Sequence, residues 1–393
     1  MTPVPARLIY FVFGSFLVTL FSGGMIISVF ILSCVYIIYN FRPLLSFHKL
    51  PGLQIIALIS FSIWVSISYF WSISPETSME TMLKFWLINL LGITAIVGLI
   101  QNDLKTKNVL NDNLLLALLG LISFILIAEH VTNYKFAIFL RNALNFDRYN
   151  YGQPMDHATA LYSLLLPFSL YYFWDKKIHL YILTILSVIV FVLHPMFAAM
   201  LAVSLALLLS IILAFLNKRW HIAFSILTVI FIFSMPQIMS FVLGLDTLQA
   251  IESIPSSWQE RIDIWNKSIV LINESPVMGW GLDTSSSIEK VLNDSLTGII
   301  QVHPHNIPLQ IRLESGIVGI SLFCIFVGLV WRKILQQQDR LFFTACVASI
   351  CIYFVFSIVS FNAWHSWWLC TQYLAVIVII SFQKICSDKT QHP

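Results

Sequence analysis

The sequence predicts an all-α, polytopic membrane protein. Of its 393 residues, 58% are hydrophobic and only 10% are charged, and the mean hydropathy is +0.85. In a soluble domain, about half of the residues are apolar and about a quarter are charged. The apolar residues also gather in long runs, and a helix needs about 20 of them to cross a bilayer. We therefore expect a single integral membrane domain over residues 1–393.

Twelve apolar runs are candidates for transmembrane helices, because each approaches the length that crosses the hydrocarbon core. They are residues 8–22, 24–39, 52–73, 81–100, 112–129, 158–174, 178–193, 196–216, 221–242, 315–331, 341–360 and 366–382. The sequence thus predicts about 12 spans, with a long connection between the ninth and the tenth.

The distribution of basic residues predicts which ends face the cytoplasm, because cytoplasmic loops collect Lys and Arg. Fourteen of the 22 basic residues fall at the two termini and in alternate turns, whereas the other side holds 14 of the 19 acidic residues. Those basic residues are Arg7, Arg42, Lys49, Lys105, Lys107, Lys176, Lys177, Lys218, Arg219, Arg332, Lys333, Arg340, Lys384 and Lys389. We expect both termini to be cytoplasmic and the long loops, roughly 130–157 and 243–314, to face outward.

Several functional classes lack their sequence signals. The chain has no Walker loop and no dinucleotide-binding glycine motif, so a primary pump is not expected. The six cysteines show neither a disulfide framework nor zinc-ligand spacing; they are Cys34, Cys324, Cys346, Cys351, Cys370 and Cys386. We predict no metal, no cofactor and no nucleic-acid partner. A secondary transporter or flippase is the non-enzyme alternative, although ionisable residues are nearly absent from the middle of the predicted spans.

The outward loop 243–314 carries a helix signal of its own. Residues 257–260, Ser-Trp-Gln-Glu, form a capping box, and apolar residues then recur at spacings of four and three. This pattern predicts an amphipathic helix, roughly 257–273, at the membrane surface, followed by a tight glycine turn at 278–281. Arg261 lies in its first turn, where a positive charge opposes the helix dipole. Local helix stability therefore does not account for Arg261, and snorkelling along the apolar face is its simplest alternative role.

The segment from His303 to Gly319 concentrates chemically useful side chains just before and at the start of a predicted span. We expect Pro304 and Pro308 to hold a non-helical path that directs the His305 side chain. Gly316 and Gly319 are small residues that would let a neighbouring helix approach closely. His305 is a candidate general base, because an imidazole titrates near neutrality. The simpler alternative is a histidine at a helix entrance that is satisfied by backbone groups.

Two other outward regions carry candidate ligand-binding groups. The loop 130–157 mixes charged residues with tyrosines, which suits an anionic or sugar ligand, although a solvated interfacial loop is the better explanation for most of them. Asp156 and His157 begin the next predicted span, where a helix N-terminus favours anions. The residues Trp364, His365, Trp367 and Trp368 form an aromatic patch. We expect this patch to anchor the protein in the headgroup region, with sugar stacking as the alternative role.

Three sequence blocks, taken together, resemble the bacterial O-antigen ligase superfamily. They are residues 261–265 (Arg-Ile-Asp-Ile-Trp), residues 275–281 (Ser-Pro-Val-Met-Gly-Trp-Gly), and His305-Asn306 followed by Gly316-x-x-Gly319. This superfamily also contains O-antigen polymerases and protein O-oligosaccharyltransferases. The chain departs from the family where a Ser-Arg-Gly triplet is usual, because residues 193–199 read Leu-His-Pro-Met-Phe-Ala-Ala. Either Arg148, Arg141 or His194 replaces the usual arginine, or this protein handles its donor differently.

The resemblance implies a glycosyltransferase of the O-antigen ligase type. Such an enzyme transfers a glycan from a polyprenyl diphosphate donor to a hydroxyl of the lipid A core, at the periplasmic face of the bacterial inner membrane. Alternatives within the superfamily are an O-antigen or exopolysaccharide polymerase and a protein O-oligosaccharyltransferase. The implied partners are the lipid-linked donor, the lipid A core or another hydroxyl acceptor, and membrane lipids.

The resemblance also suggests roles for individual residues. His305 would be the general base, and Asn306 would orient His305 or the donor. The residues expected to bind substrate are Arg261, Arg148, His194, His157 and His303. Arg261 is the candidate for the donor diphosphate, because its planar guanidinium matches phosphate oxygens.

Overall fold

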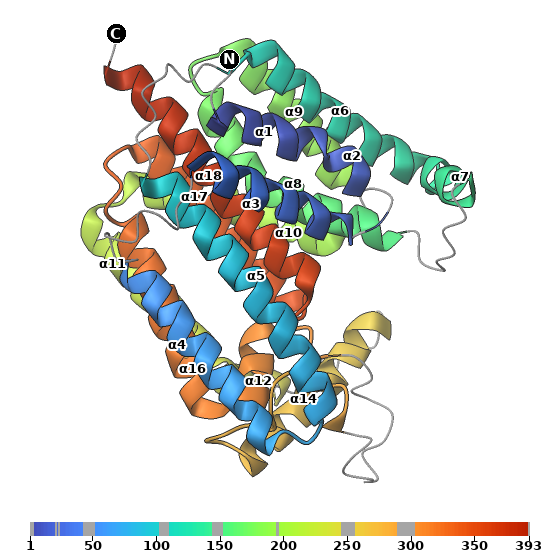
Figure 1. Ribbon diagram of the computed structural model, residues 1–393, viewed down its shortest axis with the longest axis vertical. Coiled ribbons are helices and arrows are strands. Elements are labelled where there is room, and N and C mark those ends of the chain that lie inside the picture. The colour runs from blue at the N-terminus through green and yellow to red at the C-terminus, as the bar shows by residue number, and fades with distance from the viewer. Residues whose placement is uncertain are drawn as a thin grey trace.

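Every regular element that the computed structural model describes is a helix (Figure 1), which confirms the predicted all-α class. The described residues are 4–19, 22, 24–41, 52–101, 110–143, 152–193, 196–244, 256–288 and 303–391. The helices are α1 (Val4–Gly14), α2 (Phe16–Thr19), α3 (Met25–Phe41), α4 (Leu53–Ile67), the 3₁₀ helix η2 (Ser68–Trp71), α5 (Pro75–Gln101), α6 (Asp112–Val131), α7 (Lys135–Ala143), α8 (Gly152–Tyr172), α9 (Lys177–Leu193), α10 (Phe197–Phe215), α11 (Lys218–Phe233), α12 (Met235–Leu243), α14 (Ser256–Glu274), α16 (Ile307–Ile334), α17 (Arg340–Val359) and α18 (Ser366–Gln391).

The described helices make the chain an integral membrane protein. By length and composition, seven of them can cross a membrane, or eight if the bent pair α11 and α12 counts as one span. A helix occupies each of the twelve predicted apolar runs, but α1, α3 and α9 are shorter apolar helices. The polytopic class is therefore confirmed, whereas the count of twelve spans stays a prediction.

Two predicted spans are interrupted. The run 8–22 was expected to be one helix, but α1 ends at Gly14 and α2 begins at Phe16. The run 221–242 was also expected to be continuous, but α11 and α12 meet at Ser234 with a bend of 71°. Pro236 lies in the first turn of α12 and has no N–H to continue the helical hydrogen bonding, so the chain restarts in a new direction there.

The core of the bundle lies between α17, α18 and the helices around them. Along the α10–α17 contact, α10 buries Ala199, Ala202 and Ala206, and α17 buries Ala345 and Ala348. Small side chains let two helix backbones approach closely, which strengthens packing where lipid supplies no hydrophobic driving force.

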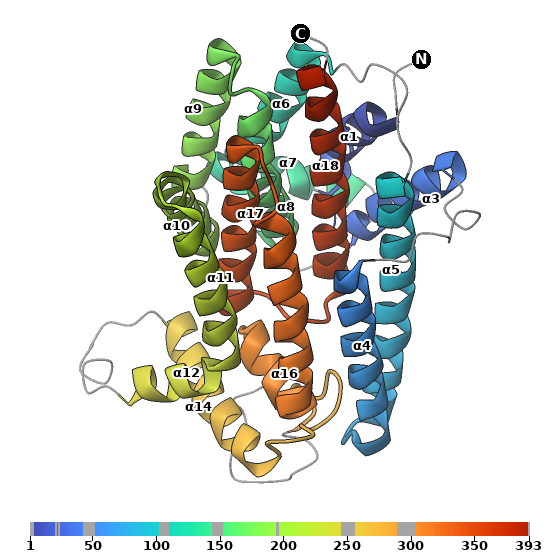
Figure 2. The ribbon, with the colours of Figure 1, turned by 90° about the vertical axis from the view of Figure 1, so that its left-hand side faces the viewer.

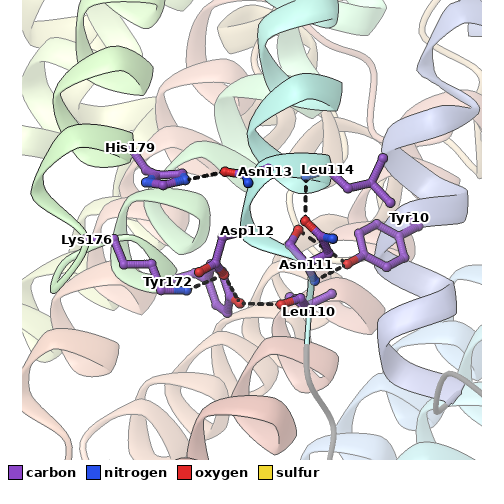
Figure 3. Close-up of polar contacts among 9 residues, drawn as sticks. All are labelled: Tyr10, Leu110, Asn111, Asp112, Asn113, Leu114, Tyr172, Lys176 and His179. Carbon is purple, nitrogen blue, oxygen red and sulfur yellow. Dashed lines mark hydrogen bonds and ion pairs between the residues drawn. The ribbon is translucent and has the colours of Figure 1, made fainter.

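The two ends of the molecule differ in what they carry. At one end, α12 and α14 lie beside the lower end of α16, whereas the C-terminal end of α18 and the start of α6 lie at the other (Figures 1 and 2). Polar side chains near the latter end join α1, α6, α8 and α9 (Figure 3). Asp112 accepts a hydrogen bond of 2.7 Å from the Tyr172 hydroxyl and pairs with Lys176. The Asn111 amide donates to the Tyr10 hydroxyl, which holds α1 against the start of α6.

Candidate functional site

Helix α16 begins directly after the predicted catalytic segment, at Ile307. Asn306 is its N-cap, with φ −147° and ψ 102°, and the side-chain oxygen Oδ1 accepts a hydrogen bond of 3.0 Å from the Leu309 amide. Pro308 lies in the first helical turn, where its missing N–H costs no hydrogen bond. The expectation that Pro308 precedes the helix is therefore wrong, and α16 starts eight residues before the predicted span 315–331.

His305 is held in an unusual backbone conformation. Its φ is +54°, in the left-handed region that non-glycine residues seldom occupy. Such a conformation costs on the order of 1–3 kcal/mol and persists only where surrounding contacts enforce it. Three contacts do so: the Trp265 indole donates to the Pro304 carbonyl at 2.8 Å, His305 Nδ1 lies 2.9 Å from the Ser360 carbonyl, and Asn306 caps α16.

The contact with Ser360 sets the protonation of the His305 ring. Because a carbonyl oxygen can only accept, Nδ1 carries the hydrogen and Nε2 keeps its lone pair in the neutral ring. No described residue forms a hydrogen bond with Nε2. Burial lowers the pKa of His305 below the ordinary 6.5, and the charge of Arg261 lowers it further, while the Ser360 bond acts in the opposite direction. His305 is therefore neutral near pH 7, as a general base must be.

Two further histidines lie against His305. The His303 ring centre is 4.1 Å from that of His305, and the His365 ring centre is 5.3 Å from that of His303. His303 is only 5% exposed, and neither of its ring nitrogens has a hydrogen-bond partner among the residues that the structure describes. Burial lowers the pKa of His303 to about 3, with smaller contributions in the same direction from His305 and His365. His303 is thus a neutral ring with two unsatisfied nitrogens beside the candidate base.

Arg261 lies on α14 close enough to act electrostatically on both His303 and His305. Its guanidinium carbon is 5.2 Å from the centre of the Trp258 ring. Burial lowers the pKa of Arg261, and none of the described carboxylates forms an ion pair with it. A half-buried guanidinium without an ion pair among the described residues is costly unless it has an anionic ligand to hold.

The predicted amphipathic helix explains how Arg261 reaches this position. The predicted helix 257–273 is α14 (Ser256–Glu274), so its bounds agree within a residue. Its apolar face packs on α16 through a buried cluster that includes Trp265, Ile272, Leu309 and Leu313. This packing brings Arg261 beside the histidines that precede α16.

His157 reaches the same end of the molecule from α8. It was expected at the start of a helix, but α8 begins at Gly152 and includes it. Its ring stacks on Trp367 with centres 3.5 Å apart and an interplanar angle of 19°, and its buried Nδ1 has no hydrogen-bond partner among the described residues. Two other predicted binding residues, Arg148 and His194, lie outside the described residues, and Arg141 is described by its backbone alone.

The aromatic patch is largely internal, so the headgroup-anchoring prediction is wrong for two of its members. Trp364 is 5% exposed and donates from its indole to Glu314. Trp368 is fully buried and stacks on Tyr353 at 5.7 Å and 4°. Both indoles therefore pack inside the protein rather than at the lipid surface.

Helix α16 is broken at Gly316, and the segment after α14 completes the broken turn. Gly316 has φ +66°, and a Cβ there would overlap the Val277 carbonyl. The Trp280 amide donates to the Leu313 carbonyl at 3.1 Å, and the Ile317 amide donates to the Pro276 carbonyl at 3.0 Å. The expected close approach of a helix at Gly316 is wrong, since its neighbour is a loop.

At Gly319 the predicted close approach of a neighbouring helix is confirmed in part, since α4 lies against this residue. A Cβ at Gly319 would overlap the Ser315 side chain and lie 3.3 Å from Trp64 of α4. The Trp64 indole also donates to the Ser315 carbonyl at 2.9 Å, which satisfies another group freed by the break in α16.

A buried polar network on α16 was not predicted. Glu314 is fully buried, and its carboxylate accepts from the Asp283 amide at 2.9 Å, the Ser285 amide at 3.3 Å, the Gln310 side chain at 3.1 Å and the Trp364 indole. The sequence did contain a signal for this network, because Gln310 and Glu314 are a polar pair four residues apart on an otherwise apolar helix face. Its partners could not be read, because they lie far away in sequence.

The described residues contain no group of three or more His, Cys, Asp or Glu side chains placed to hold a metal ion.

Comparison with known proteins gives a family match over the segments that carry this candidate site. The fold and the site define a helical membrane protein whose polar, histidine-rich centre lies near one end of the bundle. A family model described as O-antigen ligase matches residues 182–324, which include Arg261, His305 and the Gly316-x-x-Gly319 motif. This match supports the resemblance to the O-antigen ligase superfamily that the sequence motifs predicted.

Rickettsial relatives extend the similarity over most of the chain. Proteins named "Putative polysaccharide ligase" from Rickettsia conorii and Rickettsia felis are 24% and 26% identical to it, respectively. Each match covers 79% of this chain and 75% of the relative. The family and these names indicate a glycan-transferring enzyme of the membrane.

Proposed function

We propose that the protein transfers a glycan from a polyprenyl diphosphate to an acceptor hydroxyl, that of the lipid A core, at the periplasmic face of the inner membrane. The observation that carries this proposal is the pairing of two groups: a neutral His305 whose Nε2 has no hydrogen-bond partner among the described residues, and an Arg261 that forms no ion pair with a described carboxylate and lies within electrostatic range of His305. A hydroxyl nucleophile needs a base, and a diphosphate leaving group needs positive charge.

The proposed reaction is one displacement at the anomeric carbon. Nε2 of His305 takes the proton of the acceptor hydroxyl as its oxygen forms a bond to that carbon. The bond between this carbon and the diphosphate oxygen breaks, and the electron pair leaves with the diphosphate. Arg261 stabilises the negative charge on the leaving group through its two-pronged guanidinium. The reaction uses neither a metal nor a cofactor, because the diphosphate is already an activated leaving group.

Asn306 has a narrower role than the sequence suggested. Its Oδ1 is occupied by the cap of α16, so this oxygen cannot orient His305. Its Nδ2 is buried and has no hydrogen-bond partner among the described residues. The same is true of both ring nitrogens of His303. We infer that these groups contact the bound substrate, because buried polar groups in folded proteins are almost always satisfied.

The acceptor distinguishes the members of the superfamily, so it is the variable to test. Purified protein in liposomes would be given radiolabelled glycan on polyprenyl diphosphate, with or without lipid A core. Label that moves to lipid A core only when that core is present supports the ligase. Elongation of the polyprenyl-linked glycan indicates a polymerase, and labelling of an acceptor protein indicates an O-oligosaccharyltransferase. Translocation of the donor without any new glycosidic bond would contradict the enzymatic proposal.

A further inference from the structure

Glu314 is a carboxylate with no role in the proposed reaction. It lies two turns into α16 from Ile307, is fully buried, and has no cationic partner among the described residues. Burying an unpaired charge costs several kcal/mol unless hydrogen bonds replace its water. A leucine at this position would pack at lower cost, so hydrophobic packing does not explain the carboxylate.

The four donors to Glu314 come from three different segments. Two are the backbone amides of Asp283 and Ser285, after α14, and one is Gln310 on α16 itself. The fourth is the Trp364 indole, in the turn between α17 and α18. Each carboxylate oxygen accepts two of these bonds, so Glu314 joins the three segments at one point.

Gln310 strengthens the connection to the α17–α18 turn. Its Nε2 also donates to Asn362 Oδ1 at 3.2 Å, and its Oε1 accepts from the Ala363 amide at 3.0 Å. Asn362 Oδ1 in turn accepts from the Trp364 amide at 2.7 Å. Residues 362–364 are therefore held to α16 by Glu314 and Gln310 together.

This turn follows the carbonyl that orients the proposed base. Ser360 is the C-cap of α17 and lies two residues before Asn362, and its carbonyl accepts from His305 Nδ1 at 2.9 Å. His305 itself is fixed to α16 by the Asn306 cap. The base precedes α16, whereas the carbonyl that fixes its tautomer lies at the end of α17. Glu314 and Gln310 hold these two segments at a fixed distance from each other.

We propose that Glu314 is a positioning residue for the glycan transfer: it holds the Ser360–Trp364 turn against α16 so that His305 presents a free Nε2 to the acceptor. The inference rests on the proposed function, since it assigns Glu314 its role through His305. Partners that orient a metal-binding histidine through its second nitrogen typically change affinity or activity by about 10–100-fold when altered, and we expect a loss of the same size here.

The test is Glu314→Gln, which keeps the shape but turns one oxygen into an NH₂ group that faces N–H donors. We expect kcat to fall by about 10–100-fold with KM for the donor little changed. Glu274→Gln is the matched control, because Glu274 is the exposed last residue of α14 and lies outside this network. Its kcat should equal that of the wild type.

The pH profile separates positioning from general loss of structure. The groups that act electrostatically on His305 are Arg261 and Glu260 of α14, and His303 and His365 lie beside it. The Ser360 hydrogen bond raises the pKa of His305, so losing this bond lowers that pKa. In Glu314→Gln the rising limb of kcat against pH should therefore move to lower pH. A structural loss would reduce the amount of active protein and leave the limb in place.

Two results would overturn the inference: unchanged kcat in Glu314→Gln, or a lower kcat with an unmoved pH limb. If Glu314→Gln does not reach the membrane, Trp364→Phe carries the test, since it removes one of the four donors. A smaller loss with the same pH shift supports the inference, and wild-type behaviour refutes it. Full transfer by a His305→Ala variant would instead refute the proposed function, so the two failures are distinguishable.

Discussion

At the scale of single residues, the proposed chemistry depends on how His305 and Arg261 are surrounded. Both are candidates that the sequence alone predicts, because each lies in a short motif whose residue types suit proton and phosphate chemistry. The Ser360 carbonyl that selects the tautomer of His305 could not be identified in this way. It lies 55 residues further along the chain, and only the packing of α17 against α16 brings it to His305. The partners of Glu314 could not be identified from the sequence for the same reason.

Arg261 should tolerate no substitution by lysine. If Arg261 holds the donor diphosphate through two parallel bonds, Arg261→Lys keeps the charge but loses the fork. We expect both Arg261→Lys and Arg261→Ala to lower kcat/KM for the donor by about 10²-fold or more. Titration of the polyprenyl-linked donor at fixed acceptor measures this loss. Wild-type use of limiting donor by Arg261→Ala would remove the proposed anion site.

The pH dependence should report the neutral form of His305. Because burial and Arg261 lower its pKa below 6.5, the base is unprotonated above that pH, and activity should be flat through neutrality. The rising limb should lie below pH 6.5. Arg261→Ala removes a charge that lowers this pKa, so the limb of the residual activity should move to higher pH. A limb above 6.5 in the wild type would conflict with a buried base.

At the scale of elements, the period of apolar residues predicts α14 well but does not predict where α16 begins. Helix α14 lies on a surface, so its pattern alone marks its bounds. The first turns of α16 contain Gln310, Arg312 and Glu314, which a hydropathy reading excludes from a span. Gln310 and Glu314 are tolerated there because the α17–α18 turn and residues 283–285 satisfy them. Tertiary contacts therefore extend the helix beyond its apolar part.

The break in α16 should be sensitive to a single methyl group. Gly316→Ala places a Cβ against the Val277 carbonyl at a φ of +66°, so we expect a loss of about 1–3 kcal/mol in the free energy of unfolding. Gly120→Ala is the control, since its Cβ would meet only Leu186 at 3.8 Å. Within helix α6 that change should be neutral or stabilising by up to about 1 kcal/mol. Thermal unfolding in detergent compares them, and equal midpoints would contradict the proposed clash.

At the scale of the whole molecule, composition predicts the class and the charge distribution predicts an orientation. The structure separates the end that carries α14 from the end where α18 terminates (Figure 2). This separation is what an outward site and cytoplasmic termini require, although the sidedness itself stays a prediction. The breaks at Ser15 and Ser234 could not be read from hydropathy, because average hydropathy does not respond to the direction of a helix.

Orientation can be tested with two introduced cysteines. Val277 is 54% exposed at the end that carries α14, and Lys177 is exposed at the start of α9. An impermeant thiol reagent should label Val277→Cys in intact spheroplasts and Lys177→Cys only after permeabilisation. The unmodified chain is the control for background labelling, because all six of its cysteines are free thiols and four of them are buried. Equal labelling of both variants from outside would contradict the predicted orientation.

The proposed glycan transfer depends on His305 acting as a base, and substitution of this residue tests that role most directly. His305→Asn is the sharpest variant, because asparagine tolerates a positive φ but cannot take a proton. His305→Ala serves as its companion. With membrane levels matched to the wild type, both should lower transfer of labelled glycan to lipid A core by about 10²–10⁴-fold or more. Near-normal transfer by His305→Asn would contradict the account.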